Sequence, residues 1–150
     1  MILFLDFDGV LHPHPTRDER QLFCRRPTFE KVIRDFPHVE IVISSRWRRE
    51  YNLDQLRAFF SDDVSANIID VTPELVDLDE PIDVLAKCPR QFEIEGWLRH
   101  SGRTRENWVA IDYRPYWFRP FISNLVICDP SVGIDDTVAM SLHRKLRRFS

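Results

Sequence analysis

The segment Ile2-Leu3-Phe4-Leu5-Asp6-Phe7-Asp8-Gly9-Val10 carries the most informative pattern of the chain. It begins with a uniformly apolar run, which is typical of a strand buried on both faces of a parallel sheet. Asp6 and Asp8 follow one residue apart, and side chains at this spacing lie on the same side of an extended segment. Gly9 then allows a sharp turn away from the strand. Because ligands bind beyond the carboxyl ends of parallel strands, we expect a site here.

The acid pair has a defined chemistry. Two carboxylates in a semi-buried site repel each other, and a hard divalent cation such as Mg²⁺ relieves that conflict. One carboxylate can attack phosphorus, and the other can protonate a leaving oxygen and later deprotonate water. The alternative is an acidic turn or a calcium loop. A calcium loop would continue with further acids and a distal Glu, whereas Leu11-His12-Pro13 follows.

Apolar runs and helical periodicities alternate along the rest of the chain. The expected strands are 2–7, 39–43, 67–71, 108–111 and 125–128, and the expected helices are 27–36, 47–60, 91–99 and 135–147. This order predicts one α/β domain over residues 1–150, a Rossmann-like three-layer sandwich with about five mostly parallel strands. The polar stretch 12–26 is expected to be a flap, and no large cap domain is expected. The acidic stretch 74–89 has no clear pattern.

Composition excludes several classes of protein. The chain has 150 residues, 43% of them hydrophobic, and a net charge of −3, which argues against a protein that coats nucleic acid by bulk charge. The positions of the four glycines exclude the glycine-rich dinucleotide and phosphate loops. Three cysteines without a C-x-x-C pair favour a reducing, cytoplasmic setting. We find no signal peptide and no apolar run of membrane-spanning length.

Polar side chains follow three other expected strands. Ser44 and Ser45 come after the second strand, Asp112 after the fourth and Asp129 after the fifth. The two serines could cap the following helix, and a helix N-terminus also attracts anions. The pair His12 and His14 lacks an identifiable third ligand for a transition metal, so we expect these histidines to line the flap or touch substrate.

Four segments resemble the haloacid dehalogenase (HAD) superfamily of phosphotransferases. The first motif of that superfamily is an apolar strand ending in D-x-D-G, which residues 3–10 match. The run IVISSRW at 41–47 is similar to the second motif of small capless members, some of which are linked to RNA-repair systems. Residues 108–112 resemble the fourth motif, and 126–134 resemble the strand and turn before the final helix. The resemblance therefore covers most of the chain.

This resemblance implies catalytic and phosphate-binding roles. Asp6 would be the nucleophile, and Asp8 would be the general acid and base. A hydroxyl of the second motif would hold a phosphoryl oxygen. Ser45 is the first choice, because it stands two residues before Trp47, where the resembling proteins tend to carry Thr; Ser44 is the second choice.

The resemblance also implies a cation for the phosphate and a metal ion. Lys87 lies in the right region for the cation, but Arg90 is better placed relative to the helix that follows, and Arg binds phosphate through a bidentate fork. Either residue could instead be a solvated surface charge. Mg²⁺ would be held by Asp6, the Asp8 backbone carbonyl and Asp112.

The expected function is that of a Mg²⁺-dependent phosphomonoester phosphatase that acts through an aspartyl-phosphate. Its substrate would be a phosphorylated small molecule or a nucleic-acid end, since Arg46, Trp47 and Arg114 flank the motifs and such residues suit nucleotides, although Trp47 could equally be core. The fourth motif commonly has two acids, whereas only Asp112 is present. That departure favours the alternative of a catalytically weak HAD-fold binding or regulatory domain. No obligate protein partner is evident.

Overall fold

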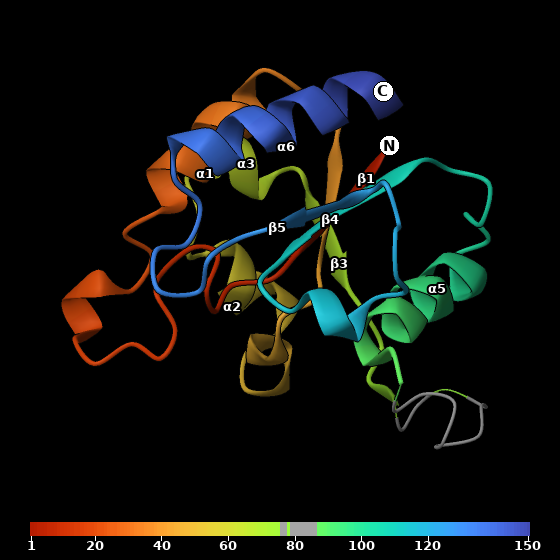
Figure 1. Cartoon of the computed structure of the whole chain (residues 1–150), viewed down its shortest axis with the longest axis horizontal. Helices are drawn as coiled ribbons and strands as arrows, with labels where there is room; N and C mark the ends of the chain where they lie inside the picture. The colour runs from red at the N-terminus through yellow and green to blue at the C-terminus, as the bar shows by residue number, and fades with distance from the viewer. Residues whose placement is uncertain (76–77, 79–86) are drawn as a thin grey trace.

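The computed structural model describes residues 1–75, 78 and 87–150. Five parallel strands form one sheet in the order β3-β2-β1-β4-β5 (Figure 1). The strands are β1 (Ile2–Leu5), β2 (Glu40–Ile43), β3 (Ile68–Val71), β4 (Trp108–Asp112) and β5 (Leu125–Ile127). The N-terminal strand is thus the central one, with β2 on one side and β4 on the other.

The residues of β1 are divided between two hydrophobic cores. Leu3 and Leu5 contact the core on one face of the sheet, and Ile2 and Phe4 contact the core on the other. All four side chains are fully buried. A strand covered on both faces needs apolar residues at every position, which explains the absence of polar alternation in this segment.

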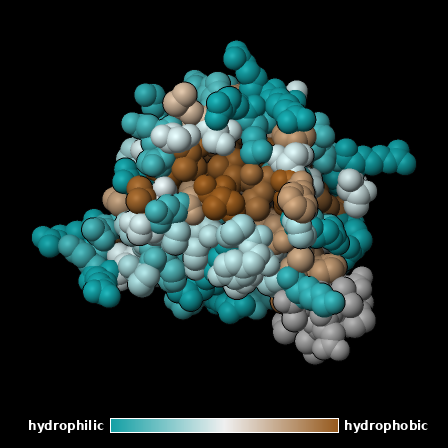
Figure 2. Space-filling model, viewed as in Figure 1, coloured by the Kyte–Doolittle hydropathy of each residue, from teal (hydrophilic) through white to brown (hydrophobic). Residues whose placement is uncertain are grey.

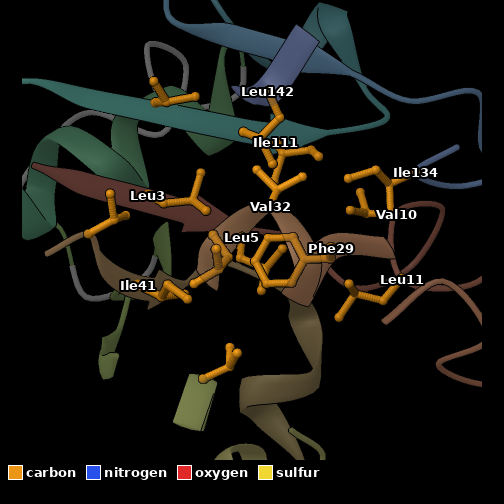
Figure 3. Packing of buried hydrophobic residues seen from close by; sticks show 14 of the residues in the cluster. Leu3, Leu5, Val10, Leu11, Phe29, Val32, Ile41, Ile111, Ile134 and Leu142 are labelled. Atoms are coloured by element: carbon orange, nitrogen blue, oxygen red, sulfur yellow. The ribbon is translucent and has the colours of Figure 1, made fainter. Parts of the chain in front are cut away.

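Helices cover both faces of the sheet, which makes the fold a three-layer α/β sandwich of the Rossmann type. On one face, α1 (Arg26–Arg34) and α6 (Asp136–Phe149) contribute Phe29, Val32 and Leu142 to the first core (Figure 3). On the other face, α5 (Pro89–His100) contributes Ile94, Trp97 and Leu98. No large cap domain is inserted among the described residues.

The helix expected over 47–60 is wrong as a single element. The structure has a 3-10 turn, η2 (Arg46–Arg49), and then a separate short helix, α2 (Leu53–Arg57). Asn52 starts α2 with a capping box, in which its side chain accepts from the Gln55 amide and the Gln55 side chain accepts from the Asn52 amide. This reciprocal capping favours a new helix start over continuation of the preceding turn. A further short helix, α3 (Asp62–Ser65), was not expected.

The expected flap contains one 3-10 turn, η1 (Glu19–Gln21), and otherwise lacks regular structure up to α1. Its first residue, His12, is fully buried, so the segment is anchored where it leaves the sheet. Most of the acidic stretch 74–89 lies outside the described residues. Pro115–Trp117 forms another 3-10 turn, η4, directly after β4.

Figures 1 and 2 show where the chain termini lie and where apolar side chains reach the surface. The N- and C-termini lie close together at the amino ends of the strands (Figure 1). In the same view, apolar side chains gather over β5, the edge strand beyond β4, where Ile127 is 38% exposed (Figure 2).

Among the described residues, no helix combines the length and the apolar character that crossing a membrane would require.

Candidate active site

The carboxyl ends of the three central strands bring the first group of expected site residues together. Asp6 follows β1 and donates its backbone N–H to Ile111 of β4, while the Ser44 amide after β2 donates to Leu5 of β1. Asp112 ends β4. These backbone bonds continue the sheet ladder by one residue, so the positions of the polar side chains are set by the register of the strands.

Arg90, in the first turn of α5, lies at the centre of this group. Its Nε donates to Asp112 Oδ2 at 3.0 Å, and its Nη2 lies 4.0 Å from Asp6 Oδ2. Its Nη1 donates to the Ser44 carbonyl and, at 3.1 Å, to Glu93 Oε2. The guanidinium is buried together with all three carboxylates. Lys87 is exposed, in the turn before α5. The structure thus brings Arg90, and not Lys87, to the acids.

The Asp6 carboxylate is only partly satisfied. Its Oδ1 accepts the Phe7 backbone N–H at 2.8 Å, while its buried Oδ2 has no hydrogen-bond partner among the described residues. Burial, reinforced by the negative charge of Asp112, raises the pKa of Asp6 to about 7, although Arg90 opposes the shift. An unpartnered oxygen, on a carboxylate whose pKa lies near neutrality, is free to act as a nucleophile or as a metal ligand.

Asp8 is in the opposite electrostatic state. Its Oδ1 accepts from His12 Nε2 and from Trp47 Nε1, both at 2.9 Å, and its Oδ2 accepts from Arg46 Nε at 2.9 Å. Burial alone would raise the pKa of Asp8, but the His12 and Trp47 hydrogen bonds and the Arg46 charge hold the pKa well below its usual range. The structure therefore keeps Asp8 as an oriented carboxylate.

His12 is a positioning residue that the motif pattern alone did not assign. Its Nδ1 accepts the Phe23 backbone N–H at 3.4 Å, so its Nε2 is the nitrogen that carries the proton donated to Asp8. His14 instead packs against the Tyr113 ring, with the ring centroids 5.5 Å apart. The two histidines thus do not form a pair. In the sequence, the one available hint of the His12–Asp8 hydrogen bond is that His12 stands four residues after Asp8.

The two serines occupy different environments. The Ser45 hydroxyl caps η2 by accepting the Trp47 amide at 3.3 Å. The Ser44 hydroxyl makes no hydrogen bond to the described part of the chain. Both residues are buried, and both carbonyls accept from Arg48 Nη1. The capping role anticipated for these serines is therefore filled by Ser45.

Arg48 and Glu93 were missed as supports of the site. Arg48 donates to the backbone carbonyls of Ser44, Ser45 and Thr72 and lies 3.0 Å from Glu93 Oε2. Glu93 Oε2 also accepts from Arg90, so both arginines bind the same buried carboxylate. Charged residues in a helical pattern look like surface residues in a sequence, and only the fold shows that they point inward.

Asp112 is fully engaged by its neighbours. Its Oδ1 accepts the backbone N–H groups of Tyr113 and Arg114 at 2.7 and 2.9 Å, while Arg90 occupies Oδ2. Asp129, after β5, is exposed, and its Oδ1 accepts from the backbone N–H and the hydroxyl of Ser131 in a turn. The site has a single acid at this strand end, as the sequence indicated.

The residues fit a magnesium ion in part. Within residues 1–75, 78 and 87–150, no three His, Cys, Asp or Glu side chains are grouped to hold a metal ion by themselves. The negative charge of Asp112 is nevertheless close enough to raise the pKa of Asp6, and Asp6 Oδ2 has no hydrogen-bond partner among the described residues. Mg²⁺ characteristically takes one or two carboxylates and completes its shell with water and substrate phosphate.

Comparison with known proteins gives one family. A family model described as the HAD domain in Swiss Army Knife RNA repair proteins matches residues 2–139, a span that includes every residue of the candidate site. No curated protein and no solved structure matches the chain.

Proposed function

The chain belongs to the family of HAD domains found in Swiss Army Knife RNA repair proteins, and from this premise we propose that it is a Mg²⁺-dependent phosphatase of phosphate monoesters. The observation that carries the proposal is the buried Asp6 carboxylate with an unpartnered oxygen, close to Asp112 and Arg90. Such a group is costly to keep in a fold unless a ligand or a reaction uses it.

In this proposal Asp6 attacks phosphorus and forms an aspartyl-phosphate as the leaving oxygen departs. Asp8 delivers the proton to that oxygen and later removes a proton from the water that hydrolyses the intermediate. Asp8 must first accept a proton, so its present partners Arg46, Trp47 and His12 have to loosen when substrate arrives. Water is thus activated on the side where the leaving group was.

Arg90 and the serine hydroxyls would hold the phosphoryl oxygens. Arg90 Nη2 is the donor nearest to Asp6, and Ser45 is our first candidate hydroxyl, with Ser44 as the second. Lys87 would reach the site only if the turn before α5 changed. Parallel Ser44→Ala and Ser45→Ala variants separate the candidates, because only loss of the phosphate-binding hydroxyl should raise KM for phosphate esters.

Mg²⁺, held by Asp6, Asp112 and the Asp8 backbone carbonyl, would neutralise charge on the phosphoryl group as it is transferred. The substrate class is a phosphorylated small molecule or nucleic-acid end, and the RNA-repair description of the family favours the end of a nucleic acid. The three free cysteines, with Cys24 exposed, suit the reducing conditions of the cytoplasm.

Phosphate release from a generic aryl phosphate tests the proposal. The wild type should be active with Mg²⁺ and inactive with a chelator, and Asp6→Asn should lose activity by several orders of magnitude because the nucleophile is gone. Glu19→Gln on the exposed 3-10 turn η1 is the matched control and should keep wild-type rates. Equal rates for the wild type and Asp6→Asn would refute the scheme.

The alternative is a catalytically weak binding or regulatory domain on the same fold. The single acid at Asp112, with all its oxygens already engaged, is the observation that favours it. Calorimetric titration with MgCl₂ discriminates: a folded protein that takes up no Mg²⁺ and releases no phosphate would be a binding module.

A further inference from the structure

We propose that a second anion-binding subsite lies beside Asp8 and takes the internucleotide phosphate next to the terminal phosphate of a nucleic-acid strand. The inference rests on the proposed function, because it takes the terminal phosphate to be bound at Asp6. It adds a requirement that a simple phosphate monoester cannot meet, which is a second phosphate in the same molecule.

An open hollow of about 430 Å³ adjoins Asp8, large enough for a nucleotide. Its walls are Asp8, Arg46, Trp47, Arg49, Glu50 and Tyr51. Asp8 is the proposed acid, and an acid must reach the leaving oxygen to protonate it. The hollow therefore lies on the leaving-group side of the reacting phosphate, where the remainder of the substrate has to go.

Two arginines of the hollow are available to an anion. Arg46 is 56% exposed and paired with Asp8, and Arg49 is 59% exposed and paired with Glu74. Both guanidinium groups are exposed on the side of the hollow, although the Asp8 side chain is only 8% exposed, so a substrate phosphate can bind them from solvent and compete with Asp8 and Glu74. Arg48, between them in sequence, is only 4% exposed and is committed to backbone carbonyls and Glu93.

Arrival of an anion at Arg46 would also free Asp8. Arg46 Nε is the donor to Asp8 Oδ2, at 2.9 Å. If the guanidinium turns to an internucleotide phosphate, that oxygen is left open towards the leaving group. The second phosphate would thus bind and uncover the acid in one movement.

The aromatic wall favours nucleic acid over a phosphorylated peptide. Trp47 and Tyr51 are stacked, with centroids 5.5 Å apart and an interplanar angle of 19°, and Phe59 packs edge-on against both. Rings fixed in this way give a flat surface for a sugar or a base without a large entropy cost. The acid Glu50 also lines the hollow, so the phosphate should lie towards Arg46 and Arg49.

The test compares three substrates that share one reacting group: an aryl phosphate, a nucleoside monophosphate and a dinucleotide with the same terminal phosphate, the last two with 3′- and with 5′-phosphates. The measured quantity is the ratio of kcat/KM for dinucleotide over mononucleotide. We expect a ratio of at least about ten for one of the two polarities, since a charge-assisted hydrogen bond is worth about that factor.

Arg46→Gln and Arg49→Gln should each bring the ratio down to about two or less. Because the ratio cancels effects on the shared chemical step, a change in it reports the second phosphate and not a damaged acid. Arg147→Gln, at an exposed position in the last turn of α6, is the matched control and should leave the ratio unchanged. A phosphoserine peptide used as well as the dinucleotide would overturn the choice of nucleic acid.

A binding arm makes the inference testable without turnover. In the Asp6→Asn background with Mg²⁺, fluorescence anisotropy of a labelled, terminally phosphorylated dinucleotide should show at least about tenfold tighter binding than the labelled mononucleotide, and Arg49→Gln should remove the difference. If the protein binds the dinucleotide more tightly but the wild type does not hydrolyse aryl phosphate, the proposed phosphatase function is refuted and the subsite is not. Equal affinities, or a preference that survives both arginine variants, would refute the subsite.

Discussion

Arg90 is the main positive charge in the buried group formed with Asp6, Glu93 and Asp112. It is buried against these carboxylates, and within residues 1–75, 78 and 87–150 only Arg48 adds further positive charge to this group, through Glu93. A buried ion group of this kind gains little net stability compared with apolar residues, but removal of one member leaves uncompensated charge. We therefore expect Arg90 to matter for the stability of the fold, in addition to the phosphate binding proposed for it.

Arg90→Gln should lower the stability of the protein by about 3 kcal/mol, because three carboxylates then share a buried space without their common partner. In a domain of this size, that corresponds to a fall in Tm on the order of 10 °C. Thermal unfolding followed by circular dichroism measures it. Arg90→Lys keeps the positive charge but loses the forked guanidinium, so its Tm should lie between the Tm of the wild type and that of Arg90→Gln. A wild-type Tm for Arg90→Gln would contradict the buried network.

Asp6→Asn should make the metal-free protein more stable at pH 8, by roughly 5 °C in Tm, because a neutral amide avoids the burial of charge. The folded-state pKa of Asp6, about 7, lies above its unfolded value of 3.8. The wild type consequently loses stability as pH rises from about 4 to 7, and the difference between the two proteins should grow over that window.

Differential scanning calorimetry between pH 4 and pH 8, with chelator present, measures this difference. Glu19→Gln removes an exposed carboxylate and should show no comparable gain at any pH. A difference between Asp6→Asn and the wild type that is independent of pH would mean that Asp6 titrates normally.

At the residue scale, the sequence indicated the side chains that follow strands, and the family resemblance added Arg90, but Arg48 and Glu93 were missed. Asp6, Ser44 and Asp112 come directly after apolar runs, and the parallel sheet fixes where such residues meet. Arg48 and Glu93 lie in helical or turn segments whose orientation depends on packing, which no local pattern encodes. Because a geometry does not report a reaction, the roles of all the candidate residues stay predictions: Asp6, Asp8, Ser44, Ser45, Lys87, Arg90 and Asp112.

At the scale of elements, the caps determine where the helices begin. Asn52 and Gln55 satisfy each other's backbone N–H groups at 2.9 Å and start α2 six residues later than the apolar periodicity suggested. By contrast, α6 runs close to its expected limits, because Asp135 caps it and Leu142 and Leu146 are buried on one face. A periodicity shows which face is buried, but local hydrogen bonds decide whether two turns form one helix.

Asn52→Ala should destabilise the protein by about 1 kcal/mol, the usual cost of losing an N-cap acceptor. The corresponding change is a decrease of a few degrees in Tm, on the order of 2–4 °C. Urea denaturation with a constant m-value measures the free energy of unfolding. Asn52→Ser retains a capping oxygen and should recover most of the loss. Equal losses in the two variants would show that the side-chain oxygen is not what matters.

At the scale of the whole molecule, binding of Mg²⁺ at Asp6 should stabilise the folded protein by mass action. At 100 times the dissociation constant the gain is about 2.7 kcal/mol, which corresponds to a rise in Tm of roughly 5–10 °C. A thermal-shift titration with MgCl₂ measures it. Asp6→Asn should show little shift, while Glu19→Gln should match the wild type. An equal shift in Asp6→Asn would place the ion elsewhere.

The fold as a whole was predictable because its signals are regular. Buried parallel strands read as continuous apolar runs, and the alternation of strands with helices allows few arrangements. The family match over residues 2–139 agrees with that architecture. The strand order was not predicted, because it depends on pairings between distant segments that leave no local trace.

That order has a consequence for how the protein is made. Of the five strands of the sheet, β1 is synthesised before the others and lies at the centre, and Ile2 pairs with Trp108, 106 positions later. Until β4 has been synthesised, one edge of β1 stays open and Asp6 has neither Ile111 nor Asp112 beside it. Such long-range closure slows folding, and this fully apolar strand keeps one edge unpaired until β4 has emerged.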